Sequence, residues 1–134
     1  MIHLDTTFAV DLLREVRRRQ PGAATAMRGR LEREPLRISV HVACELLAGV
    51  ELSRQRTEER QRVLRFCDAV DIAYPDAQFA PAYGRLLALQ QRTGRTVGTR
   101  DLLIATAAIL DEAPLLTRNK REFSRIPDLE IIGY

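Results

Sequence analysis

The chain has 134 residues, of which 46% are hydrophobic and 29% are charged. This length suits one domain, and this composition excludes a disordered or collagen-like chain. The net charge is +3, and Lys120 is the single lysine among 21 basic residues. An arginine-rich surface is suited to gripping phosphate groups, so nucleic acid is a compatible partner. Codon bias in a GC-rich genome is the alternative explanation of the same composition.

The two cysteines, Cys44 and Cys67, form no Cys-x-x-Cys pair, and we expect both to be buried as small hydrophobic residues. Neither His3 nor His41 stands at zinc-ligand spacing from them. No secretory signal pattern begins the chain, and the longest nearly apolar run, Leu102–Leu110, is too short to span a bilayer. A cytoplasmic protein without membrane insertion is therefore expected.

Apolar runs and helical spacing alternate along the first half of the chain. Short apolar runs predict strands, and apolar residues three or four apart predict helices. In chain order we expect a strand at 1–4, a helix ending in the basic residues 17–19, a helix at 23–34, a strand at 36–40, a helix at 40–52, a helix through 63–67 and a strand at 70–73.

The second half repeats the alternation. We expect a helix at 75–93 that ends at Gly94, a loop at 96–100, a uniformly apolar helix opened by Asp101, a strand at 114–117, a polar connection at 118–124 and a strand at 129–132. Regular alternation of this kind predicts an α/β fold with a central, mostly parallel β-sheet flanked by helices on both faces. Without any linker composition, residues 1–134 are expected to form one domain.

Three carboxylates occupy unusual places in this pattern. Asp5 follows the first strand, Glu45 is the one acid in the apolar part of its helix, and Asp101 opens the most apolar helix. Asn119 follows the strand at 114–117 by two residues. Ligands of open α/β sheets bind beyond the carboxyl ends of the strands, so we expect these groups to converge there. Converging carboxylates repel one another unless a cation lies between them, and hard oxygen ligands suit Mg²⁺ or Mn²⁺.

Each residue also has a purely structural explanation. Asp5 is a favourable helix N-cap, and Asp101 is a favourable acid in the first turn of a helix. Asn119 is a common turn residue. His41 shares a helix face with Glu45, but no second histidine supports it as a metal ligand, so we expect an ordinary helix residue there.

Four segments, in this order, resemble the PIN-domain nucleases and, among them, the VapC-type toxins of bacterial toxin–antitoxin pairs. They are Ile2–Thr7, Glu45–Val50, Asp101–Ala108 and Leu116–Phe123, the last trailed by Ile126–Ile131. Together they span nearly the whole chain. The resemblance implies a PIN fold and a Mg²⁺-dependent endoribonuclease that cuts single-stranded RNA.

Carried over by position, the resemblance implies that Asp5, Glu45 and Asp101 are the acidic catalytic and metal-binding residues. Asn119 stands where many relatives have a fourth acid, which leaves one or two metal ions open. Arg100 is unusual at its position, and it could pair with a site carboxylate or contact the substrate. A homodimer and a cognate VapB-like antitoxin are also implied.

The resemblance leaves two other functions open, a housekeeping PIN nuclease of RNA processing and a non-catalytic RNA-binding module. Apolar faces of the helices at 8–16 and 40–52 could form the antitoxin groove, the dimer surface or simply the core. Candidate phosphate contacts are Arg118, Lys120, Arg121, Arg125 and residues 17–19, each of which could also be a solvated surface charge.

Overall fold

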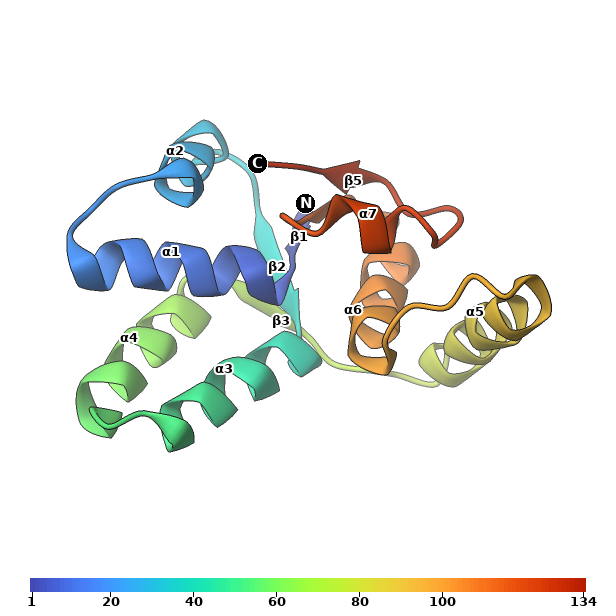
Figure 1. Ribbon diagram of the computed structural model, residues 1–134, viewed down its shortest axis with the longest axis horizontal. Helices are drawn as coiled ribbons and strands as arrows, with labels where there is room; N and C mark the ends of the chain where they lie inside the picture. Colours follow the sequence, from blue (N-terminus) through green and yellow to red (C-terminus); the bar gives the residue numbers. More distant parts are fainter.

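The computed structural model describes residues 1–134 and contains a five-stranded sheet in the order β3-β2-β1-β4-β5 (Figure 1). Every neighbouring pair of strands is parallel, as the alternation predicts. The strands are short: β1 Ile2–Leu4, β2 Leu36–Ser39, β3 Asp71–Ala73, β4 Leu115–Leu116 and β5 Ile131–Ile132.

Seven helices flank the sheet on two sides. Their bounds are α1 Thr6–Arg18, α2 Ala23–Arg30, α3 Val40–Leu52, α4 Arg56–Asp68, α5 Phe79–Thr93, α6 Thr99–Leu110 and α7 Lys120–Phe123. Right-handed crossovers place α1 to α4 on one face, because the chain moves from β1 through β2 to β3. The chain then returns toward β4 and β5, so α5 to α7 lie on the other face (Figure 1).

Local sequence sets several helix ends. The side chain of Ser39 accepts a hydrogen bond from the backbone N–H of Val42 and caps α3. Gly94 ends α5 with a φ of 70°, a left-handed conformation that costs glycine little, so its predicted role is confirmed.

The structure corrects four predicted boundaries. The second helix ends at Arg30 and does not reach residue 34. Residues 75–78 precede α5, because the side chain of Asp76 accepts a hydrogen bond from the N–H of Gln78 and forms a turn there. Helix α6 begins at Thr99, two residues before Asp101. The segment predicted as a polar connection contains the short helix α7.

A core of 22 buried apolar residues fills the space between the sheet and the helices. The expectation that both cysteines are buried is wrong for Cys44, which is exposed because it lies on the side of α3 away from the sheet; Cys67 is half-buried. Helices long and apolar enough to cross a membrane do not occur in the structure.

His3 of β1 is the largest polar side chain that is fully buried. Its Nε2 atom lies 2.5 Å from Oδ2 of Asp111, the same oxygen that accepts a hydrogen bond from Arg37 Nη1 at 2.9 Å. Burial lowers the pKa of His3 from its ordinary value of 6.5, although the hydrogen bond to Asp111 opposes the shift. The folded protein therefore resists protonation that the unfolded chain accepts.

We expect the free energy of unfolding to fall as the pH decreases from 7 to 5, because the unfolded state binds the proton of His3 first. Urea unfolding at several pH values measures this dependence. A His3→Gln variant should flatten it more than His41→Gln, since His41 is only partly buried. Equal pH dependence in wild type and His3→Gln would contradict the assignment.

Candidate active site

The carboxylate of Asp5 lies between the carboxyl ends of β1 and β4. Its Oδ1 accepts a hydrogen bond from the N–H of Thr6 at 2.7 Å and so caps α1. Its Oδ2 accepts hydrogen bonds from the hydroxyls of Thr7 at 2.8 Å and Thr117 at 2.7 Å. Only 3% of Asp5 is exposed. The helix-capping interpretation of Asp5 is therefore correct, and the same contacts fix its carboxylate in one orientation.

The topology explains why these residues meet. The chain leaves β1 toward β2 and leaves β4 toward β5, so the strand order reverses between β1 and β4. Such a switch point opens a crevice at the carboxyl edge of the sheet. Asp5 and Thr117 stand on the two sides of it, and the N–H of Asn119 donates to Thr117 Oγ1 at 2.9 Å.

A cavity of about 500 Å³ opens at this edge, and all four predicted site residues line it. They are Asp5, Glu45, Asp101 and Asn119, which come from four separate parts of the chain. The backbone of Gly98 and the side chains of Thr6, Arg100 and Arg118 complete much of the remaining wall. The structure thus brings together the set that the sequence predicts to converge.

Mutual repulsion among the acids is evident at Asp101. Burial is the main cause that raises the pKa of Asp101 above its ordinary value of 3.8, and the negative charges of Asp5, Glu45 and Glu122 raise it further. The positive charge of Arg100 opposes them. Several negative charges that lie close together and partly buried are stabilised by a cation bound between them.

Sequence reasoning missed the fourth of these acids, Glu122. It lies in α7, which was not expected, and its side chain is about one-third exposed. The available signal was its position three residues after Asn119, a spacing that places two side chains on the same face of a helical turn.

Glu45 reaches the cavity from α3 with 21% of its side chain exposed, and its Oε1 lies 4.0 Å from Nε of Arg100. Arg100 is thus near enough to pair with a site carboxylate, as one of its two expected roles requires. No three carboxylate, imidazole or thiol groups lie close enough together to enclose an ion by themselves. The acids therefore surround an open space and do not form a closed cage.

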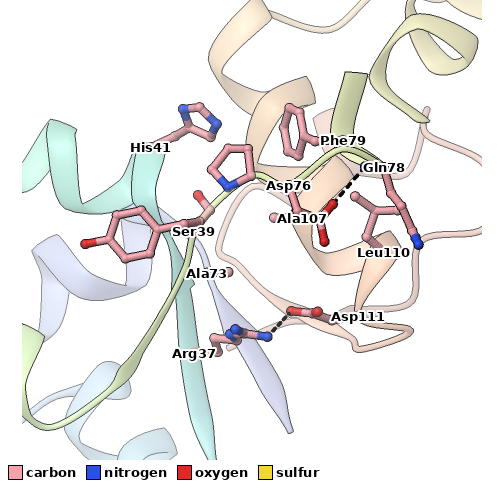
Figure 2. A pocket seen from close by; sticks show the side chains of 12 residues that line it. Arg37, Ser39, His41, Ala73, Asp76, Gln78, Phe79, Ala107, Leu110 and Asp111 are labelled. Carbon is pink, nitrogen blue, oxygen red and sulfur yellow. Dashed lines mark hydrogen bonds and ion pairs between the residues drawn. The ribbon is translucent and has the colours of Figure 1, made fainter. Parts of the chain in front are cut away.

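His41 does not belong to this cavity, although it shares a face of α3 with Glu45. It lines a different cavity of about 250 Å³ together with Arg37 and Asp111. Figure 2 shows its ring beside Phe79 and away from the paired Arg37 and Asp111. The centroids of the His41 and Phe79 rings lie 5.7 Å apart. Burial lowers the pKa of His41. The expectation of an ordinary helix residue agrees with this position.

A groove of about 330 Å³ adjoins the acidic cavity. It is lined by Val10 and Leu13 of α1, by Leu46 and Gly49 of α3, and by Val63 of α4. Val10 and Glu45 line both spaces, so the groove leads directly to the candidate active site. Faces of the two helices that the sequence singled out therefore form part of an open groove as well as part of the core.

Arginine side chains lie around the cavity mouth. Arg118 lines the cavity, and its Nη1 pairs with Oδ2 of Asp11 at 2.9 Å. The hydroxyl of Tyr134 donates to the same oxygen at 2.7 Å, and burial is the main cause that raises the pKa of Tyr134. Lys120, Arg121 and Arg125 are exposed on or just after α7. A polyanion entering the cavity would meet Arg100 and Arg118, which line it.

Comparisons with known proteins agree with this architecture. Residues 2–129 match the model of the PIN domain family. Ribonuclease VapC19 of Mycobacterium tuberculosis is 36% identical over 128 residues, which cover 95% of each chain. Ribonuclease VapC2 of Rickettsia felis is 36% identical over 92 residues, which cover 69% of each chain.

Solved structures give the same result. The crystal structure of VapBC2 from Rickettsia felis bound to a promoter DNA fragment superposes with a TM-score of 0.88 at 29% identity, covering 100% of this chain and 99% of that one. DNA-bound VapBC from Salmonella typhimurium gives a TM-score of 0.87 at 28% identity, with 98% and 96% covered. The chain therefore belongs to the PIN-domain family and, within it, to the VapC-type ribonucleases.

Proposed function

We propose that this protein is a Mg²⁺-dependent endoribonuclease and the toxin of a toxin–antitoxin pair, with Asp5, Glu45, Asp101 and Asn119 as its active site. One observation carries the proposal: these four residues converge on a single open cavity at the switch point of the sheet. The names of the VapC ribonucleases supply the reaction class. The substrate is a phosphodiester bond of single-stranded or looped RNA.

The donor set fits Mg²⁺. This ion binds oxygen ligands, keeps several of its waters, and is usually held by one or two carboxylates together with a substrate phosphate. An open cavity lined by carboxylates leaves room for these waters and for the phosphate, whereas a closed cage of protein ligands would not. Thr6 adds a further oxygen, because its hydroxyl is buried in the cavity wall and has no partner. Mn²⁺ has similar preferences and could substitute.

When bound, Mg²⁺ would act as a Lewis acid that lowers the pKa of water and neutralises phosphate charge. Asp5 and Asp101 would bind the ion, with Asp5 held rigid by its hydroxyl contacts. Glu45 would bind the ion or orient the attacking water, and the amide of Asn119 would position that water. In-line attack of this water on phosphorus would break the bond to the 3′ oxygen, which would leave as a 3′-hydroxyl, and the phosphate would stay on the 5′ side of the next nucleotide.

RNA cleavage by the purified protein tests this proposal directly. We expect cutting with Mg²⁺ and none with EDTA, and Mg²⁺ should raise the melting temperature of the wild type because it relieves the repulsion at Asp101. Asp128→Asn, which neutralises an exposed acid outside the cavity lining, is the control variant and should leave both effects of Mg²⁺ unchanged. Equal cleavage in Mg²⁺ and EDTA would refute the metal-dependent mechanism.

The proposed partners are a VapB-like antitoxin and a second copy of the chain. The groove between α1, α3 and α4 is lined by both apolar and charged residues and shares Glu45 with the acidic cavity. It therefore suits an antitoxin segment that carries an arginine to the acids. Co-expression with the product of a neighbouring small gene should suppress cleavage and protect this groove. Without such a gene, a housekeeping nuclease becomes the better interpretation. Analytical ultracentrifugation, which gives the mass of the particle in solution, tests whether two copies associate.

RNA binding should depend steeply on salt. If Arg118, Lys120, Arg121 and Arg125 each contact a phosphate, affinity for single-stranded RNA falls about 50-fold between 50 and 200 mM salt. Titration of labelled RNA into the Asp101→Asn variant measures this slope without cleavage. The slope is that of log affinity against log salt concentration. Arg118→Ala should reduce its magnitude by about 0.7, and an unchanged slope would exclude a phosphate contact by Arg118.

A further inference from the structure

A third cavity, of about 260 Å³, opens between α5, the 94–98 loop and the segment after α7. Much of its wall is apolar: Leu86 and Leu89 of α5, Leu102 of α6, and Ile126 with Pro127. Its volume lies near the lower limit of small-molecule sites, which suits one planar ring better than a larger ligand. The active-site proposal gives this cavity no role.

Gln90 provides the polar group in this wall. It is only 7% exposed, and its Oε1 accepts a hydrogen bond from the N–H of Val97 at 2.9 Å. A backbone N–H can only donate, so this contact fixes the orientation of the amide. The amide nitrogen Nε2 is then a buried donor without a partner. Buried donors are rarely left unpaired, so Nε2 lacks a hydrogen-bond acceptor, and a carbonyl oxygen can supply one.

Two arginines stand at the mouth of this cavity. Nη1 of Arg125 donates to the carbonyl of Thr96 at 3.2 Å and lies 3.6 Å from Glu122 Oε2, which positions it on the side facing the acids. Arg95 lines the same cavity and is exposed. Since Nε2 is covered in the free protein, its contact with a ligand requires a side chain of the cavity wall to move.

The cavity lies beside the candidate active site. Leu102 lines it, and the preceding residue of α6, Asp101, lines the acidic cavity. Arg125 of this cavity also lies 3.6 Å from Glu122, whose negative charge acts on Asp101 of the acidic cavity.

We propose that this cavity is a base-binding subsite for the RNA nucleotide next to the cleaved bond, which rests on the proposed function. The base inserts among the leucines, its carbonyl oxygen accepts from Gln90 Nε2, and Arg95 and Arg125 hold the flanking phosphates. Glutamine reads adenine with both halves of its amide, but Val97 already occupies the oxygen of Gln90. Where uracil carries O4 and guanine carries O6, adenine carries an N6 amino group that donates and cannot accept from Nε2. The subsite therefore prefers uracil or guanine to adenine.

Gln90→Glu tests the subsite, because it keeps an oxygen for Val97 and replaces the donor with an acceptor. Cleavage of a random RNA pool, followed by sequencing of the ends, should show the preference for uracil or guanine over adenine reduced about three- to tenfold at one position beside the cut. Gln91→Glu adds the same charge at an exposed neighbour in α5 and should leave the preference unchanged. An unaltered base preference in Gln90→Glu would overturn the subsite.

Binding of free nucleotides separates this proposal from the cleavage reaction. Titration with uridine or guanosine 5′-monophosphate should shift the side-chain amide resonances of Gln90 in the wild type, and adenosine 5′-monophosphate should shift them less. If these shifts occur and RNA is not cut, the subsite stands and the proposed function fails. If RNA is cut but the resonances do not respond to any nucleotide, the subsite is wrong.

Discussion

Replacement of Asp101 by asparagine is expected to reduce RNA cleavage at least about a hundredfold and to raise the melting temperature at neutral pH. The carboxylate is half-buried and faces the negative charges of Asp5, Glu45 and Glu122. Asparagine has nearly the same shape and removes the charge. Loss of activity and gain of stability from one substitution would mark a residue retained for chemistry and not for folding.

The pH dependence of this gain has a definite sign. Because the pKa of Asp101 is raised in the folded protein, the native state takes up the proton before the unfolded chain does. As the pH falls from the raised pKa toward 3.8, the wild type recovers stability relative to the variant, and the difference in melting temperature shrinks. Calorimetry at several pH values measures it. A variant less stable than wild type at pH 7 would contradict the repulsion.

Asp5→Ala is expected to abolish cleavage and also to destabilise the fold, by about 2–4 kcal/mol. Alanine removes the N-cap of α1 and leaves the hydroxyls of Thr7 and Thr117 without their acceptor. Asp5→Asn keeps an oxygen for the cap, so it should lose activity equally but only part of the stability.

Urea unfolding and the cleavage assay, applied to both Asp5 variants, separate the two roles. Asp5→Ala as stable as the wild type would show that the hydroxyl contacts contribute nothing to the fold. Cleavage retained by Asp5→Asn would exclude the carboxylate from the reaction.

The convergence of these four residues on one cavity was predictable because three of them stand at element boundaries. Asp5 and Asn119 follow strands, and the carboxyl ends of parallel strands share one edge of the sheet. Asp101 precedes an apolar run, and Glu45 interrupts one, which is unfavourable unless the acid has a function. The alternation of elements then fixes the sheet as parallel. Local pattern and topology together were therefore sufficient for this part of the fold.

Contacts that depend on distant pairing were not predictable. Asp111 meets His3 across 108 residues of sequence, and nothing in the spacing of either residue reveals the other. Glu122 was missed because four residues are too few to show helical periodicity. Gln90 follows Leu86 by four residues, a spacing that favours the same face of a helix. The unpaired state of its nitrogen follows from the path of the 94–98 loop, which the sequence does not specify.

The hydrogen bond between Asp5 and Thr117 joins residues 112 apart in the chain, and it has a consequence for protein synthesis. A ribosome that has made the first hundred residues has already released Asp5 and Glu45, but β4 and Thr117 do not yet exist. Until β4 pairs with β1, the crevice between them has only one side and the carboxylate of Asp5 lacks its contact with Thr117. The candidate active site is thus completed only after β4 has left the ribosome, so chains interrupted before β4 lack a formed site.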